Sequence, residues 1–103
     1  MDKLQSIERC GHDLYKSLSR SKIRRDILIF LRKNPDNTTI FEISRNIKAS
    51  YTNTKGAILG YGKGYKEERS LASLGLVISE NGRSSVNIIL SPRGHEIAKL
   101  LEE

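Results

Sequence analysis

Asn53 and Lys55 have the side chains in this sequence that are best suited to specific polar recognition. They lie in residues 50–56, where the side chains are small or polar and none is acidic. An Asn amide can pair with adenine through two hydrogen bonds, and a Lys ammonium can reach guanine or a phosphate. The chemistry that these residues predict is therefore noncovalent recognition of base edges.

Basic side chains surround these residues. The chain has 103 residues, a net charge of +6 and a pI near 9.7, as is common among proteins that bind nucleic acids. Residues 43–66 contain no acidic side chain. We expect phosphate contacts from three cations within this window, Arg45, Lys48 and Lys63, and from Arg83 beyond it. A second acid-free window, residues 14–25, carries less weight because basic runs are often ordinary solvated surface.

Catalytic and metal-binding chemistry has few candidates. His12 and His95 are the only histidines, and the single cysteine, Cys10, excludes both an intramolecular disulfide and a cysteine-based zinc site. No motif fixes a base beside Cys10, and the adjacent Glu67 and Glu68 would point about 100° apart on a helix. We predict that the protein is not an enzyme and that it has no catalytic residue, metal, cofactor or small-molecule substrate.

The glycine-rich segment 60–65 resembles a nucleotide-binding loop only superficially. It lacks the Ser or Thr that would hold Mg²⁺, Ala57 stands where such a loop has its first glycine, and no buried strand precedes it. Two alternatives remain. The segment is either a loop that lays Lys63 and backbone N–H groups against a phosphate backbone or a purely structural hinge.

Apolar spacing and capping residues predict the elements that position Asn53 and Lys55. A first helix is expected over about residues 3–18, and a second is expected from Ser21 to the Asn34-Pro35 break. Helical periodicity continues through Ile40, Phe41, Ile43 and Ile47 and breaks at residues 48–50, where Ser50 can cap a helix over about residues 51–60. This pair predicts a helix-turn-helix. Thr54, Ala57 and Ile58 of its second helix would pack inward, with Tyr51 at the edge of that side. Thr52, Asn53, Lys55, Gly56 and Leu59 would face outward.

A hairpin is predicted after the helix-turn-helix. A leucine-patterned helix from about Lys66 to Gly75 leads to a first strand, an Asn81-Gly82 turn and a second strand over residues 86–90. A last helix is expected after Ser91, with Pro92 at its first position. A hairpin directly after a helix-turn-helix forms a wing, so the order of elements predicts a helix presented to a DNA major groove.

The predicted architecture is one α+β, mostly helical domain over residues 1–103, with a two-stranded wing and extra terminal helices. Its parts are an N-terminal helix (1–20), a winged-helix core (21–91) and a C-terminal helix (92–103). The terminal helices carry two apolar stripes, for which we predict a homodimer interface; the alternative is that the first helix folds back on its own domain. The stripes are Leu4, Ile7, Leu14 and Leu18 on the first helix and Ile97, Leu100 and Leu101 on the last.

Two motifs after the helix-turn-helix support a family resemblance. They are Leu71-Ala72-Ser73-Leu74-Gly75-Leu76-Val77 and Leu90-Ser91-Pro92-Arg93-Gly94-His95-Glu96. With residues 39–59 they resemble the winged-helix transcriptional regulators of archaea and bacteria, over about two thirds of the chain. The resemblance implies a dimer that places the second helix of the helix-turn-helix in the major groove and the wing on the adjacent minor groove or backbone.

These features together predict a sequence-specific, double-stranded DNA-binding transcriptional regulator. The alternative is a winged-helix module for protein–protein contact in a larger assembly; RNA binding is less favoured because exposed stacking aromatics are scarce. No apolar run is long enough to cross a bilayer and the N-terminus does not resemble a signal peptide, so we expect a cytoplasmic protein without membrane contact. The predicted DNA-binding residues are Arg45, Lys48, Ser50, Tyr51, Thr52, Asn53, Lys55, Gly56, Lys63 and Arg83.

Overall fold

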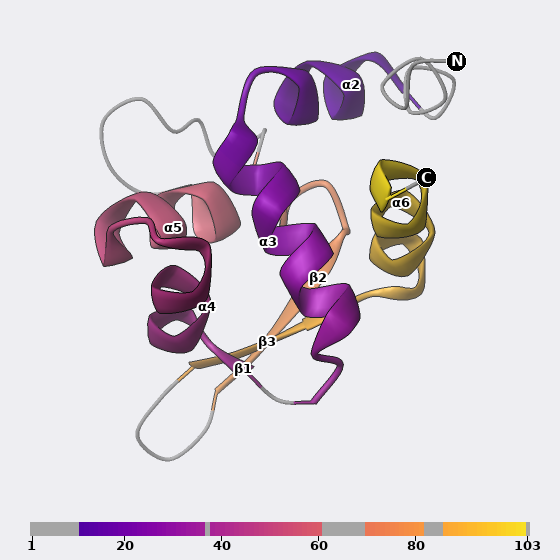
Figure 1. Cartoon of the computed structure of the whole chain (residues 1–103). Helices are drawn as coiled ribbons and strands as arrows, with labels where there is room; N and C mark the ends of the chain where they lie inside the picture. Colours follow the sequence, from indigo (N-terminus) through magenta and orange to yellow (C-terminus); the bar gives the residue numbers. More distant parts are fainter. Residues whose placement is uncertain (1–10, 37, 61–69, 82–85, 103) are drawn as a thin grey trace.

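The structure is a computed structural model that describes residues 11–36, 38–60, 70–81 and 86–102. The described residues form an α+β, mostly helical fold, as the sequence predicts (Figure 1). The central helix α3 has α4 and α5 on one side and α6 on the other (Figure 1). The helices are α2 (His12–Ser19), α3 (Lys22–Lys33), α4 (Ile40–Ile47), α5 (Tyr51–Leu59) and α6 (Pro92–Glu102), and the strands are β1 (Thr38–Thr39), β2 (Val77–Asn81) and β3 (Val86–Leu90).

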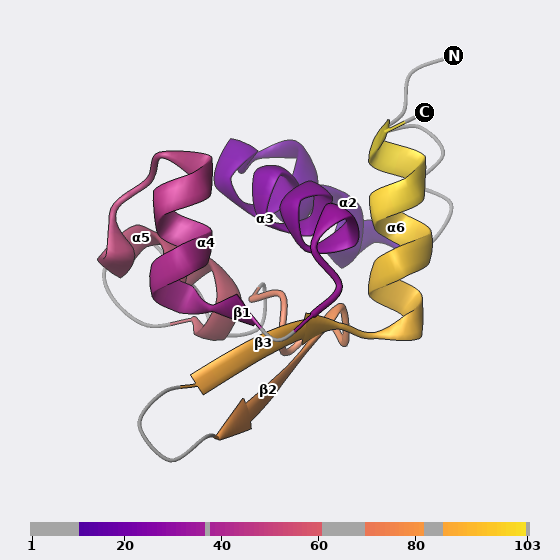
Figure 2. The same ribbon diagram turned by 60° about the horizontal axis from the view of Figure 1, so that its bottom comes forward.

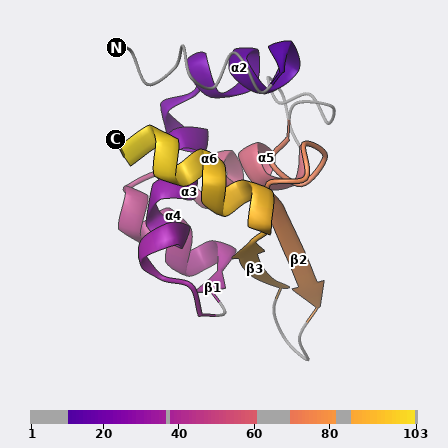
Figure 3. The same cartoon turned by 90° about the vertical axis from the view of Figure 1, so that its right-hand side faces the viewer.

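Helix α3 forms the centre of the core. Its first turn is capped by Ser21, whose Oγ accepts a hydrogen bond from the backbone N–H of Arg24 at 3.2 Å. Ile27, Leu28 and Leu31 are fully buried, at 0–1% exposure. The helix packs against α6, α4 and α5, and Figure 3 shows α6 lying across it. The sequence-based expectation that this helix is central is confirmed.

The predicted N-terminal helix does not run through Gly11. Gly11 lies just before α2. Its backbone angles, φ 143° and ψ 144°, are ones that residues other than glycine rarely adopt. Leu14 and Leu18 of α2 are buried within their own chain, at 2% and 0% exposure. Helix α2 therefore packs on its own domain through Leu14 and Leu18, as the alternative to a dimer interface predicted. Leu4 and Ile7 lie outside the described residues.

The sheet has three antiparallel strands rather than the predicted two. The order is β1-β3-β2, because Thr38 and Thr39 pair with Ile88 and Asn87 of β3. A strand of two residues is too short to leave a periodic pattern in a sequence, so β1 was not predicted. Figure 2 shows that the hairpin of β2 and β3 extends toward the side where α4 and α5 lie.

The hairpin has its second strand at the predicted residues 86–90, but its first strand includes Asn81, which was predicted in the turn. Asn81 pairs with Val86, so it lies in β2 instead of in a two-residue turn, and residues 82–85 connect the strands. This register sets Leu90 opposite Val77, and both are buried. A two-residue Asn-Gly turn would leave Leu90 beyond the end of β2. Burial of apolar side chains thus outweighs the local turn preference.

Residues 70–75 form hydrogen-bonded turns, not the end of a long leucine-patterned helix. The hydroxyl of Ser70 accepts a hydrogen bond from the N–H of Ser73 at 3.1 Å, as an N-cap residue does. The segment ends in a Schellman motif, in which Leu76 N–H donates to Leu71 O and Gly75 N–H donates to Ala72 O, with Gly75 at φ 74°. The described part is therefore one capped turn, and residues 61–69 lie outside the description.

The start of α6 is fixed to the segment before β2. The hydroxyl of Ser91 accepts a hydrogen bond from Gly94 N–H at 3.0 Å and donates one to Gly75 O, while Ser91 N–H donates to Leu76 O. A Cβ atom on Gly94 would overlap with the carbonyl oxygen of Leu76. The predicted Ser-Pro start of the last helix is confirmed, and the glycine after it is required by this close approach of two backbones. None of the helices in the described ranges has the length and apolar character needed to cross a membrane.

Candidate nucleic-acid interface

Helices α4 and α5 are joined by a tight turn with a cap on each side. Thr39 Oγ1 accepts a hydrogen bond from Glu42 N–H at 3.2 Å at the start of α4, as its capping-box spacing predicts. Lys48 ends α4 in the left-handed conformation, with φ 59° and ψ 42°. Ser50 Oγ accepts from Asn53 N–H at 3.0 Å and so begins α5. The predicted bounds of this helix pair are confirmed.

The inner side of α5 is anchored in the core. Thr54, Ala57 and Ile58 are buried at 0% exposure, as predicted. The carbonyl oxygens of Ala57 and Ile58 accept hydrogen bonds from the N–H groups of residues 71 and 72, at 3.1 and 3.0 Å. These contacts fix the C-terminal half of α5, so the N-terminal half is held as a rigid, solvent-facing end.

This N-terminal half presents small polar side chains to solvent. Tyr51, Thr52 and Asn53 are exposed, and the first turn of α5 has no acidic residue. Among the described residues, the side-chain amide of Asn53 has no hydrogen-bond partner, whereas its backbone N–H bonds to Ser50 Oγ. A helix N-terminus with a free amide and no acid can accept an anionic, hydrogen-bonding ligand.

Gly56 was predicted at the centre of the exposed face, and this prediction is wrong. The structure buries Gly56, and Lys55 beside it is half-buried. A rotation of about 100° per residue places Gly56 about 160° from both Thr54 and Ile58, so its burial does not follow from the inward side of α5; neighbouring segments cover the C-terminal half of this helix on more than one side. Leu59, also predicted to face outward, is partly buried against the core. The exposed face is therefore narrower than predicted and is centred on the first turn of the helix.

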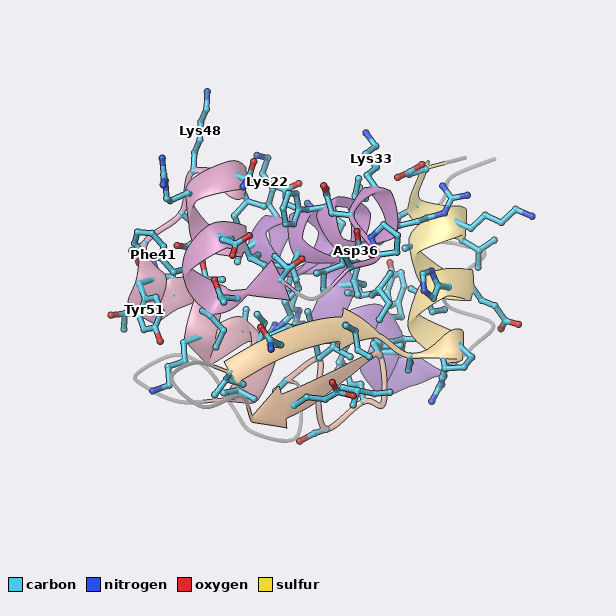
Figure 4. All side chains as sticks on the ribbon, turned by 90° about the horizontal axis from the view of Figure 1, so that it is seen from below. Lys22, Lys33, Asp36, Phe41, Lys48 and Tyr51 are labelled. Carbon is cyan, nitrogen blue, oxygen red and sulfur yellow. The ribbon has the colours of Figure 1, made fainter. Side chains whose placement is uncertain are left out.

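The predicted cations lie at different positions around α5. Arg45 on α4 and Lys48 in the turn are both exposed. In Figure 4, Lys48 extends from the edge of the molecule away from the sheet, on the same side as Lys22 and Lys33. Lys63 and Arg83 lie outside the described residues. Arg45 and Lys48 are thus exposed cations on α4 and in the turn that leads to α5.

Two arginines of the other acid-free window have a structural role. Arg24 Nη1 donates to Ser17 O at 3.3 Å, and Arg25 Nη1 donates to Leu18 O and Ser19 O at 2.6 and 3.1 Å. They cap the last carbonyl groups of α2, where positive charge is favourable. Their charges therefore serve the packing of α2 on α3.

Phe41 is a surface residue that the sequence reasoning assigned to the apolar pattern of the core. Its exposure is 57%, and the guanidinium carbon of Arg45 lies 5.7 Å from the centre of its ring. Helical spacing already indicates that Phe41 is exposed, because Phe41 is about 100° from Ile40 but only about 40° from Arg45 around the helix. Phe41 belongs to the exposed side of α4.

Two shallow hollows border this surface. One, of about 180 Å³, is lined by Glu42, Arg45 and Asn46. The other, of about 310 Å³, lies between α3 and α4 and has Ile29, Phe30 and Ile47 among its lining residues. Within the described ranges no group of three or more His, Cys, Asp or Glu side chains is placed to hold a metal ion.

Comparison with known proteins shows which family the chain belongs to. The EarA-like family matches residues 14–101, which include all five described helices from Leu14 of α2 onward. The uncharacterized protein MJ0905 of Methanocaldococcus jannaschii is 34% identical over 92 residues, which cover 87% of this chain and 82% of that protein. No solved structure matches the chain. With a matching region that spans the helix pair, the sheet and α6, this chain is a member of the EarA-like family.

Proposed function

We propose that this protein is a sequence-specific, double-stranded DNA-binding transcriptional regulator that works in the cytoplasm. The observation that carries the proposal is the N-terminal half of α5, which is exposed, free of acid and held rigidly by the buried half of the same helix. In this proposal α4, the turn and α5 act as a helix-turn-helix. The hairpin of β2 and β3 acts as its wing, in a winged-helix layout.

The roles of the residues follow from their positions. Asn53 reads a base edge, with adenine as the base that an Asn amide pairs best. Thr52 lies beside it and can donate or accept one hydrogen bond. Arg45 and Lys48, exposed on the α4 side, contact phosphates and contribute affinity without sequence preference. Ser50 acts mainly as the cap that sets where α5 begins.

The experiment that tests this function is a selection of bound duplexes from a random DNA pool by the intact protein. The proposal expects one enriched motif, bound with an affinity that falls steeply with salt. The slope of log affinity against log salt should be about −0.9 for each phosphate neutralised. An unenriched pool, with weak and uniform binding, would contradict sequence-specific regulation.

A protein–protein module is the second candidate, and the hollow between α3 and α4 favours it. Its apolar residues Ile29, Phe30 and Ile47 are only partly buried and could receive a partner's apolar side chain. Such an interface has an apolar centre, so its affinity should change little with salt. The same salt titration therefore separates the two functions.

A homodimer also stays a proposal. The structure weakens the premise on which it was predicted, because Leu14, Leu18, Ile97 and Leu101 are all at most 6% exposed within one chain. Leu100 alone among the described stripe residues is partly exposed. Light scattering of the intact protein at micromolar concentration tests the proposal: twice the mass of the chain supports it, and a monomer rejects it.

A further inference from the structure

The helix pair exposes two aromatic rings that the structure does not use for packing the core. Phe41 is the second residue of α4 and Tyr51 is the first residue of α5, with 57% and 49% of their surfaces exposed. Ile78 on β2, at 44%, is the other large apolar side chain exposed in the described part of the chain. Both rings are thus near the N-terminal ends of their helices.

The two rings lie at the same end of the molecule. Figure 4 labels both on the side formed by α4 and α5, away from α6, and the two helices pack against each other. Tyr51 directly precedes Thr52 and Asn53, the exposed polar residues proposed to face base edges. A duplex seated on the first turn of α5 would therefore come next to Tyr51, with Phe41 and Arg45 on the adjoining helix.

We propose that Phe41 and Tyr51 form an apolar contact surface for the C5-methyl groups of thymine in the major groove. This inference rests on the proposed DNA-binding function and names the base that the helix pair prefers beside the position read by Asn53. The occupant follows from the chemistry of the site. In the major groove the apolar group that a base presents is the thymine methyl, and aromatic side chains contact it.

The cation over the Phe41 ring favours DNA over a protein partner as the occupant, and it outweighs the exposed Glu42 next to Phe41 only where the guanidinium of Arg45 meets the phosphate. The guanidinium of Arg45 lies over the Phe41 ring at 5.7 Å, where it is held next to the apolar surface and can still meet a phosphate. Thus an apolar contact is bordered by a cation, a combination that matches a thymine flanked by its own phosphate. The first turn of α5 adds no acid that would repel the backbone.

The test replaces thymine by uracil, which lacks only the C5-methyl group, at each thymine of the selected duplex in turn. We expect the parent protein to lose about fourfold in affinity at one or two positions, the effect of one methyl group removed from an apolar contact. Phe41→Ala or Tyr51→Ala should bind the parent duplex more weakly and should not respond to uracil at the position that its ring contacts. His95→Ala, which truncates an exposed side chain on α6, away from α4 and α5, should respond as the parent does.

Each other outcome has a defined meaning. If the parent is insensitive to uracil at every position, or if both ring variants keep its full sensitivity, the thymine contact is refuted. If the ring variants change the mass of the protein in light scattering, the rings cover a second copy of the chain and the proposal also fails. Failure of the proposed function itself looks different, since the random pool would then yield no motif. A motif whose binding depends on Asn53 but not on any thymine methyl overturns this inference alone.

Discussion

Replacing Lys48 with glycine should stabilise the protein while weakening DNA binding. Lys48 is the one residue other than glycine with positive φ in the described part of the chain, at φ 59° and ψ 42°. This conformation costs a residue with a Cβ atom about 1–2 kcal/mol. Glycine avoids that cost but loses roughly 0.5–1 kcal/mol more conformational entropy on folding. The net gain expected is about 0.5–1 kcal/mol.

Lys48→Ala is the matched control for this gain. Alanine removes the charge of the lysine, including its favourable position at the C-terminus of α4, but it keeps the Cβ atom and therefore the strain. Relative to Lys48→Ala, Lys48→Gly should be more stable by about 0.5–1 kcal/mol in urea unfolding. For a chain of this size the difference corresponds to a rise in Tm of about 2–8 °C.

The DNA-binding role of Lys48 predicts a separate result for the same two variants. Both should bind selected and random duplexes more weakly and reduce the salt slope by about 0.9, since each lacks one phosphate contact. Equal stability of the glycine and alanine variants would refute the strain argument. An unchanged salt slope would refute the phosphate contact and leave the strain argument intact.

Three further substitutions test the structural contacts that position the site, each by urea unfolding. Gly94→Ala should destabilise the protein by about 2 kcal/mol or more, because its Cβ atom would overlap with the carbonyl oxygen of Leu76, whereas alanine at the exposed neighbour Arg93 should cost much less. Ser91→Ala should cost about 1–2 kcal/mol through loss of the hydrogen bonds to Gly94 N–H and Gly75 O, and Ser91→Thr should restore much of it. Ser50→Ala should cost about 1 kcal/mol by removing the cap of α5, with Ser50→Asp nearly as stable as the parent; a neutral Ser50→Ala would mean that the cap does not hold the helix start.

The helices and their starting points could be predicted from the sequence because each depends on local chemistry. Ser21, Thr39, Ser50 and Ser91 all accept a hydrogen bond from a backbone N–H two or three residues into the following helix, as their positions before apolar periodic segments predict. The ends of α3 at Asn34 and of α5 at Gly60 could also be predicted, the first from the proline that follows Asn34 and the second from the glycine itself.

The features that could not be predicted depend on contacts between distant segments. The strand β1 exists only because residues 38 and 39 meet β3, and the hairpin register follows from the burial of Leu90 opposite Val77. Gly56 lies about 160° around α5 from Thr54 and Ile58, so its burial depends on which other segments cover that side of the helix, and helical spacing does not predict this. The assignment of Phe41 to the core was an error of a different kind, because its angle of about 100° from Ile40 already placed it away from the core.

The location of the candidate site on α5 was predicted better than the residues that form it. Thr52 and Asn53 are exposed as expected, Tyr51 is more exposed than its predicted place at the edge of the inward side, and Arg45 and Lys48 are exposed on α4 and in the turn before α5. Gly56 leaves the site and Phe41 joins it, so its surface is more apolar than the sequence suggested. For Lys63 and Arg83 the predicted phosphate contacts stay predictions.

Base reading by α5 is tested most directly by a base-by-base comparison of the parent and Asn53→Ala on the selected duplex. Affinity is measured for the parent sequence and for every single base-pair change. Asn53→Ala should lose about 1–3 kcal/mol on the selected duplex and become indifferent to the base at one position, while discriminating at the others as before. If Asn53→Ala binds as tightly as the parent and discriminates equally at every position, α5 does not read the bases through Asn53, and the proposed role of this helix is wrong.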